Sequence, residues 1–103
     1  MSISYDLVTF VIILIDWNAF GFVLASGYRQ KVLLSIENNP KTPKEISNET
    51  GLYLTHVSTT IAELVKVDLI KCLTPALRRG KIFDLTNKGK EIEKELIKRN
   101  QKK

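Results

Sequence analysis

The fold is decided by residues 42–70, which read TPKEISNETGLYLTHVSTTIAELVKVDLI. The stretch opens with a capping box, in which the side chains of Thr42 and Glu45 can each accept a hydrogen bond from the other's backbone amide. Pro43 stands at the first helical position, where a missing amide hydrogen does no harm. Gly51 can take the left-handed conformation that ends a helix. These residues predict a short helix with Ile46 facing inward.

A second, longer helix is predicted over residues 53–67. Its apolar side chains recur at helical spacing and form one stripe, which consists of Val57, Ile61, Leu64 and Val65. A short capped helix, a glycine turn and a second helix with one apolar face make a helix-turn-helix. The outer face of the second helix carries small polar side chains, which a DNA major groove can accommodate. DNA binding is therefore the first hypothesis for function.

Residues 28–38 predict a helix that packs across this pair. Its apolar side chains recur every three or four residues, at Tyr28, Val32, Leu33 and Ile36. Asn38 and Asn39 precede Pro40, which ends the helix because proline cannot continue the hydrogen-bond ladder.

Two strands and a last helix complete the expected domain. The strands are predicted over residues 69–73 and 82–85, and the helix over 88–98, capped by Thr86 or Asn87. The loop between the strands carries three positive charges, at Arg78, Arg79 and Lys81. Such a hairpin forms a wing. The expected fold class is mainly α with a small β-hairpin (α+β), a winged helix-turn-helix over residues 28–98 followed by a frayed basic tail at 99–103.

Positive charge is concentrated in the same part of the chain. The 103 residues carry a formal net charge of +5, with a pI of about 9.4. Residues 41–103 have a net charge of +6, whereas residues 1–40 have −1. This distribution allows a polyanionic partner for the helix-turn-helix and its wing.

Residues 1–27 form an apolar segment ahead of this domain. Residues 7–25 could be a membrane span, but their apolar side chains contribute only about −5 kcal/mol to insertion and Asp16 opposes it by roughly 3 kcal/mol. We expect instead a buried element that packs against a second copy, and therefore a homodimer. A membrane-tethered regulator is the alternative, in which Arg29 and Lys31 keep the domain on the cytoplasmic side.

The composition argues against catalysis and against a bound metal. Cys72 is the only cysteine and His56 is the only histidine. One chain therefore supplies neither a multi-cysteine nor a multi-histidine metal site. No nucleophile–base pair or phosphate loop can be recognised from the spacing of the remaining residues. We expect a protein that is not an enzyme, has no cofactor, and resides in a reducing cytoplasm.

The candidate DNA-binding side chains come from three places. Those of the second helix flank its buried stripe, where hydroxyls and an imidazole can contact base edges or phosphates. Those of the wing can hold phosphates or enter a minor groove. Two lysines stand at the start of the first helix, where free amides also attract phosphate. The full set is Lys41, Lys44, Tyr53, Thr55, His56, Ser58, Thr59, Thr60, Arg78, Arg79 and Lys81.

A protein-interaction adaptor is the competing hypothesis for this surface. None of the candidate side chains on the second helix makes the bidentate arginine–guanine or asparagine–adenine contact that fixes sequence tightly. Their face of the helix can equally be an ordinary solvated surface. Winged helices also serve as adaptors in larger assemblies, and such a protein would bind no DNA.

The order of elements and five short pieces of sequence resemble archaeal winged-helix transcriptional regulators of the broad ArsR/MarR-like group. The pieces are PKEIS (43–47), TGL (50–52), HVS (56–58), LI (69–70) and FDLTNKG (83–89), and the end of the last is the most specific. The likeness covers residues 28–98 and implies a homodimer that binds double-stranded DNA. The sequence departs from the group at Tyr53, where a Ser cap is usual, and at Thr59, where a basic residue is common. The cysteine motif of metal-sensing members is absent.

Overall fold

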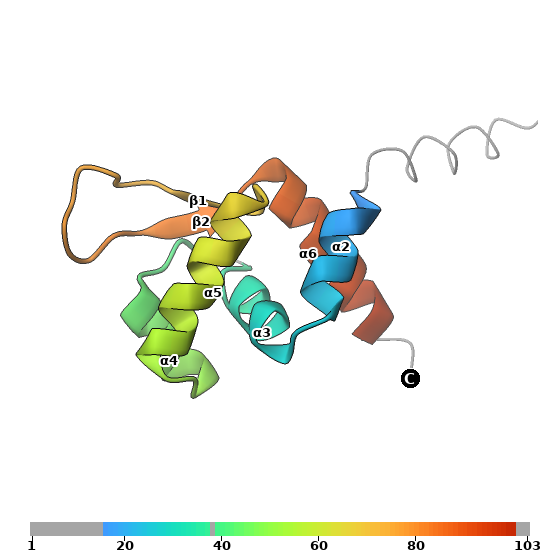
Figure 1. Cartoon of the computed structure of the whole chain (residues 1–103), viewed down its shortest axis with the longest axis horizontal. Coiled ribbons are helices and arrows are strands. Elements are labelled where there is room, and N and C mark those ends of the chain that lie inside the picture. The colour runs from blue at the N-terminus through green and yellow to red at the C-terminus, as the bar shows by residue number, and fades with distance from the viewer. Residues whose placement is uncertain (1–15, 38, 101–103) are drawn as a thin grey trace, which may run out of the picture.

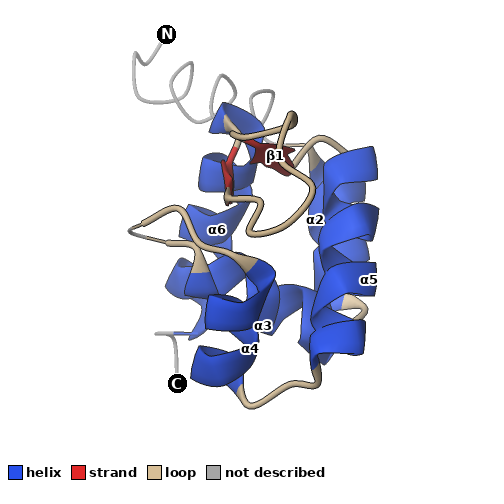
Figure 2. Cartoon of the chain, turned by 90° about the vertical axis from the view of Figure 1, so that its left-hand side faces the viewer, coloured by secondary structure: helices blue, strands red, loops and turns tan. Residues whose placement is uncertain are grey.

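The computed structural model describes residues 16–37 and 39–100, which form five helices and one antiparallel two-stranded sheet (Figure 1). The fold class is α+β, as the sequence predicts. The hairpin and its long loop extend to one side of the helical body (Figure 1), and this side faces the viewer in Figure 2. The elements in chain order are α2 (Trp17–Leu24), α3 (Gly27–Ser35), α4 (Pro43–Thr50), α5 (Leu54–Lys66), β1 (Ile70–Cys72), β2 (Phe83–Leu85) and α6 (Asn87–Asn100).

Helix α4 begins and ends where the sequence predicts. The Thr42 hydroxyl accepts a hydrogen bond from the Glu45 amide at 3.2 Å, and the Glu45 carboxylate accepts one from the Thr42 amide at 2.8 Å. Gly51 ends the helix in the left-handed conformation, with φ of 77°. Ile46 is fully buried. The capping box and the glycine therefore set both ends of the first helix of the helix-turn-helix.

Helix α5 buries a different stripe from the predicted one. Val57, Ile61 and Leu64 lie in the core as expected, but Val65 is 41% exposed and Thr60 only 4% exposed. At 3.6 residues per turn, these two side chains lie on opposite flanks of the stripe. The rest of the domain covers the flank that carries Thr60. The predictions that Val65 is buried and that Thr60 lies on the outer face are therefore wrong.

The hairpin is anchored to the start of the helix-turn-helix. Its strands pair Ile70 with Leu85 and Cys72 with Phe83. The segment ahead of α4 joins this sheet through Lys41, which exchanges backbone hydrogen bonds of 3.0 and 2.8 Å with Phe83. These hydrogen bonds connect the wing directly to the start of the helix-turn-helix.

The turn into α6 explains why LTNKG is so specific a piece of sequence. The Thr86 hydroxyl accepts a hydrogen bond from the Gly89 amide at 2.9 Å and donates one to the Asp68 carbonyl at 2.6 Å. The Thr86 amide also donates to the Leu69 carbonyl at 3.0 Å. A Cβ atom on Gly89 would lie 2.0 Å from the Leu69 carbonyl oxygen. Only glycine allows the two backbone segments to approach so closely.

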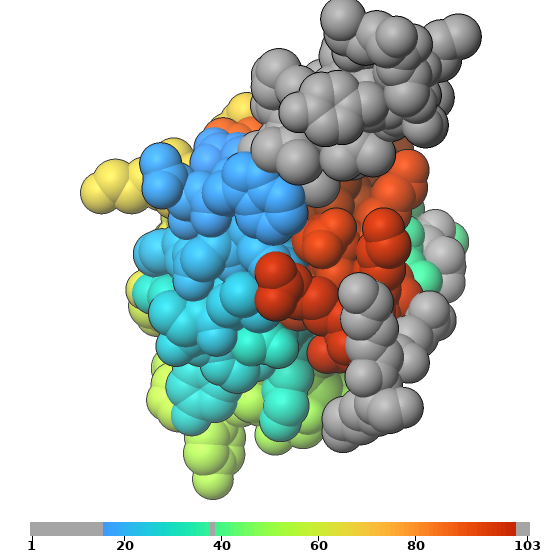
Figure 3. Space-filling model, turned by 90° about the vertical axis from the view of Figure 1, so that its right-hand side faces the viewer, coloured from blue at the N-terminus to red at the C-terminus, as the bar shows by residue number. Residues whose placement is uncertain are grey.

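Helix α2 belongs to the core of a single protomer. Asp16 caps it, accepting a hydrogen bond from the Ala19 amide at 3.0 Å. Ala19, Phe20 and Val23 are buried among the other helices. Figure 3 shows α2, in blue, beside α6, in orange and red. Within the described residues, the core therefore includes α2, which lies in the segment that the sequence assigns to the dimer interface.

Two arginines fix α2 to its neighbours. Arg29 on α3 donates to the Phe22 carbonyl at 2.9 Å, lies 3.6 Å from the centre of the Phe22 ring, and donates to Glu63 on α5 at 3.2 Å. Arg99 on α6 lies 4.9 Å from the centre of the Phe20 ring. These contacts connect α2 with three other helices.

The next observations concern the two ends of the chain, namely α6 with the basic tail and the apolar amino-terminal segment. Ile92 and Leu96 of α6 are buried in their own protomer at 0% and 1% exposure. The predicted basic tail starts inside α6, which continues to Asn100. The rest of that tail (101–103) and most of the apolar segment (1–15) lie outside the described residues. Within residues 16–37 and 39–100, no helix is long and apolar enough to cross a membrane.

Candidate nucleic-acid interface

The amino-terminal half of α5 presents a continuous polar face to solvent. Tyr53, the residue before the helix, is 77% exposed. Four polar side chains of the first turns are exposed, namely Thr55, His56, Ser58 and Thr59. Val57, between them, points into the core. Of the predicted side chains on this helix, only Thr60 is missing from the face.

Two tyrosines hold the imidazole of His56. Its ring stacks on Tyr28 of α3 with centroids 4.9 Å apart and an interplanar angle of 27°. Tyr53 meets it edge-on at 5.9 Å. Tyr28 is 44% exposed, so its predicted place in the buried stripe of α3 is wrong. The spacing of Tyr28 from Val32 suggested burial, and no feature of the sequence connects it with His56, which lies in another helix.

The basic wing and α5 share one hollow. Arg78 and Arg79 are exposed, and Lys81 is half-buried. The hollow has a volume of about 220 Å³ and lies between the helix-turn-helix and the wing; it is lined by Pro43, Ser58, Ile61, Arg78, Gly80, Lys81 and Phe83. Three of the predicted DNA-binding residues, Ser58, Arg78 and Lys81, are therefore brought together although they are far apart in the sequence.

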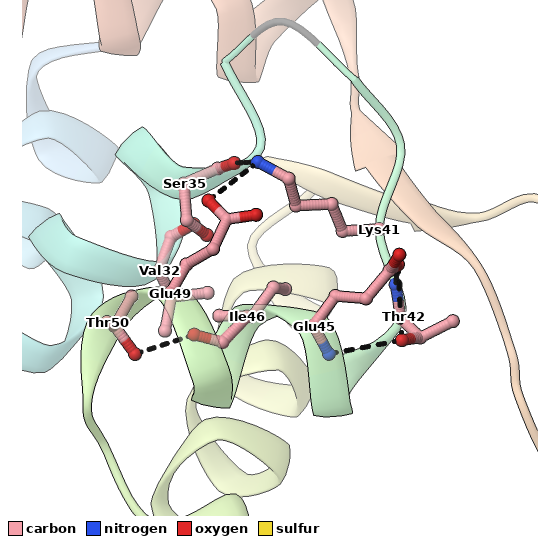
Figure 4. Close-up of polar contacts among 8 residues, drawn as sticks. All are labelled: Val32, Ser35, Lys41, Thr42, Glu45, Ile46, Glu49 and Thr50. Carbon is pink, nitrogen blue, oxygen red and sulfur yellow. Dashed lines mark hydrogen bonds and ion pairs between the residues drawn. The ribbon is translucent and has the colours of Figure 1, made fainter.

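The two lysines at the start of α4 have different surroundings. The Lys41 ammonium donates to the Ser35 carbonyl and forms an ion pair with Glu49 at 3.0 Å (Figure 4). Its side chain is only 17% exposed, so its charge is neutralised within the domain. Lys44 is exposed. The amides expected to be free are partly used, since Pro43 has none and that of Glu45 binds Thr42.

Comparison with solved structures identifies the fold. The chain superposes on a mutant of Lactococcus lactis ZitR with a TM-score of 0.67 and 19% identity, covering 75% of this chain and 53% of that one. The fold is a winged helix. Reduced HlyU from Vibrio cholerae matches with a TM-score of 0.63 and 20% identity over 84% of this chain and 93% of that one. The homodimeric winged helix-turn-helix DNA-binding domain Mb0332 from Mycobacterium bovis matches with 0.60 and 18% over 97% and 86%.

At 18–20% identity, these structural matches show a shared fold only. The chain spans about half the length of ZitR and of a MarR family transcription regulator with a TM-score of 0.61. One neighbour is described as a MarR family transcription regulator, and Mb0332 as a possible ArsR-family transcriptional regulator. No protein-family model matches the sequence, and no curated protein matches it.

Two carboxylates with shifted pKa values lie away from the wing and the amino-terminal half of α5. The hydrogen bond from Lys88, at 2.7 Å, and that from the Ala19 amide lower the pKa of Asp16. Burial, and then the nearby charge of Glu37, raise the pKa of Glu93, which is 6% exposed. Among the described residues, no cluster of three or more His, Cys, Asp and Glu side chains could hold a metal ion. The chemistry of the candidate interface is therefore that of hydroxyls, aromatic rings and fixed positive charges.

Proposed function

We propose that this protein is a transcriptional regulator that binds duplex DNA, with α5 in the major groove and the wing against the flanking backbone. The observation that carries the proposal is the common surface of α5 and the wing, where Ser58, Arg78 and Lys81 line one hollow. The exposed hydroxyls of α5 suit base edges, and the cationic wing suits phosphates. The protein acts in the cytoplasm, without metal or cofactor.

The set of contacting residues is smaller than the sequence suggested. Lys41 and Thr60 are left out, because the ammonium of Lys41 pairs with Glu49 and Thr60 is buried. The remaining residues are Lys44, Tyr53, Thr55, His56, Ser58, Thr59, Arg78, Arg79 and Lys81. Hydroxyls discriminate bases less strongly than bidentate contacts do, so we expect modest selectivity at each position.

A selection experiment tests this function. The full chain is incubated with a random duplex pool, and the bound fragments are sequenced. We expect one enriched motif with two-fold symmetry and half-sites about one helical turn, roughly 10 base pairs, apart. Absence of any bound fragment at low salt contradicts the proposal and favours the protein-interaction adaptor.

Matched variants at adjacent positions show whether α5 reads the bases. Thr59→Val and Thr60→Val make the same chemical change, the first on the exposed face and the second in the core. Thr59→Val is expected to alter the enriched motif at one or two positions. Thr60→Val should leave the motif unchanged. An identical motif for both variants and the wild type would exclude Thr59 from base recognition.

We further propose that the protein works as a homodimer and that residues 1–27 contribute to its interface. Support comes from the apolar sequence ahead of α2 and from Leu24, which is 40% exposed on that helix. Sedimentation equilibrium should give twice the 11.7 kDa of one chain. Leu24→Glu should weaken the dimer, whereas Leu77→Glu, at a 47% exposed apolar position in the wing, should not. A monomer at micromolar concentration would refute this part of the proposal.

A further inference from the structure

The hollow between α5 and the wing has the chemistry of a site for a single anion. It is lined by the cationic side chains of Arg78 and Lys81 and by the hydroxyl of Ser58. None of its seven lining residues is acidic. Its remaining walls come from Pro43, Ile61 and Phe83, which bring no charge to the hollow.

The nearest acidic residue along β2 is directed elsewhere. Asp84 follows Phe83 in the strand, and successive side chains of a strand point to opposite faces. Phe83 lines the hollow, so Asp84 lies on the other face, where its carboxylate accepts a hydrogen bond from the Leu85 amide at 2.8 Å. Gly80, with φ of 67°, brings backbone without a side chain to the rim. An anion can therefore approach three donors without meeting a carboxylate.

We propose that this hollow seats one phosphodiester group of the DNA backbone, held jointly by Ser58, Arg78 and Lys81. The inference rests on the proposed function and adds that the polar side chains of α5 have two different roles. Ser58 is a positioning residue for the backbone, and base reading is left to Thr55 and Thr59. Because one phosphate is held by both α5 and the wing, the seat sets the register of the helix in the groove.

Arg79 provides the matched control for the seat. It has the same charge as Arg78, is adjacent in sequence and is exposed, but it does not line the hollow. Arg78→Gln, Lys81→Gln and Arg79→Gln each remove one positive charge. Arg79→Gln leaves one phosphate without its cation and is expected to reduce the salt slope of DNA binding by about 0.9, whereas Arg78→Gln and Lys81→Gln each leave one cation on the shared phosphate and are expected to reduce the slope less. Only in Arg78→Gln and Lys81→Gln should the affinity for DNA depend less on one particular backbone phosphate than it does in the wild type.

A scan of backbone phosphates tests the seat. Each phosphate of one half-site of the selected duplex is replaced in turn by an uncharged methylphosphonate, and affinity is measured by fluorescence anisotropy. For the wild type, one replacement is expected to weaken binding about tenfold, the size of one lost charge-assisted hydrogen bond. The same replacement should weaken Lys81→Gln clearly less than tenfold, because one of the three donors is already lost, and Arg79→Gln by the full tenfold. Ser58→Ala should show a partial loss at the same phosphate.

The outcomes separate the seat from the function. If the wild type binds the duplex but the replacements affect Lys81→Gln and Arg79→Gln alike, the wing acts as a diffuse positive field and the seat is refuted. If the wild type binds no duplex at low salt, the proposed function fails as a whole. Circular dichroism melting curves of the four variants should stay close to that of the wild type, because none of the four substituted side chains is buried.

Discussion

Substitution of Gly89 by alanine tests the close approach of α6 to the strand that begins the wing. The new Cβ atom would lie 2.0 Å from the Leu69 carbonyl oxygen, whereas ordinary contacts begin at 3.4 Å. Both atoms belong to or adjoin backbone, so relief requires the start of α6 to move by about 1.4 Å. That movement lengthens the hydrogen bonds that Thr86 makes with Leu69 and Asp68, now 3.0 and 2.6 Å long.

The expected cost follows from these two effects. Overpacking against rigid neighbours costs about 1–3 kcal/mol. Weakening two hydrogen bonds costs roughly 1 kcal/mol each, and the helix propensity of alanine returns about 1 kcal/mol. Gly89→Ala should therefore lower the free energy of unfolding by about 2–4 kcal/mol, a large part of the stability of a small domain.

Gly21→Ala is the matched control. Gly21 lies inside α2 and is exposed, and a Cβ atom there would meet nothing within 4 Å. Helix propensity alone predicts a gain of about 0.5–1 kcal/mol. Urea unfolding followed by circular dichroism measures both variants. A Gly89→Ala protein within about 0.5 kcal/mol of the wild type would refute the reasoning, since surface substitutions give changes of that size.

Three further predictions concern the stability of the domain. The raised pKa of Glu93 means that the folded state binds its proton more tightly than the unfolded state. The contribution of Glu93 to stability is thus greatest below its unfolded pKa and is lost as the pH rises through its folded pKa. Glu93→Gln should remove this decline and raise the free energy of unfolding by about 1 kcal/mol at pH 7. Urea unfolding at pH 4 and pH 7 measures both effects. Arg29→Ala removes the hydrogen bonds to Glu63 and Phe22 and the contact with the Phe22 ring, and should lower the free energy of unfolding by about 2–3 kcal/mol. Arg29→Lys keeps the charge but not the planar guanidinium, so it should lower the free energy of unfolding by less than Arg29→Ala does. Asp68, with φ of 64°, is the only residue other than glycine with positive φ among those described, so Asp68→Gly should raise the thermal midpoint, and an unchanged or lower midpoint would show that its side chain compensates for the strain.

Local chemistry made much of the helix-turn-helix predictable. A capping box, a proline at the first position and a glycine at the end act over three or four residues, so their outcome does not depend on the rest of the fold. The same is true of the Thr86 cap of α6, which the sequence offered as one of two choices. The wing followed from turn residues and positive charge between two short apolar runs.

Tertiary packing decided what the sequence left open. An apolar stripe does not reveal which of its flanks is covered, so Thr60 was placed outside and Val65 inside. Lys41 lies beside the start of a helix, which in the sequence suggests a phosphate ligand. Only the folded structure shows that its ammonium pairs with Glu49. The stacking of Tyr28 on His56 joins two helices, and no spacing within either one encodes it.

The apolar segment of residues 1–27 shows the same limit over its described part. Their apolar character indicated burial, but a sequence does not say against what. Phe20 and Val23 are buried within the protomer, where α2 packs against α3 and α6. The site residues behave likewise: Ser58, Arg78 and Lys81 were each predicted from their own segment, and only the fold shows that they surround one hollow.

Salt-dependent DNA binding tests the central claim most directly. The affinity of the full chain for its selected duplex is measured from low to physiological salt, alongside a variant with glutamine at Arg78, Arg79 and Lys81. If five or six phosphates are neutralised, the log–log slope of the wild type should be about −5. Loss of the three charges, which hold the seated phosphate and one other, should change it to roughly −3. Equal slopes for the two proteins, or no binding of either at low salt, would contradict the account of a DNA-binding face built from α5 and the wing.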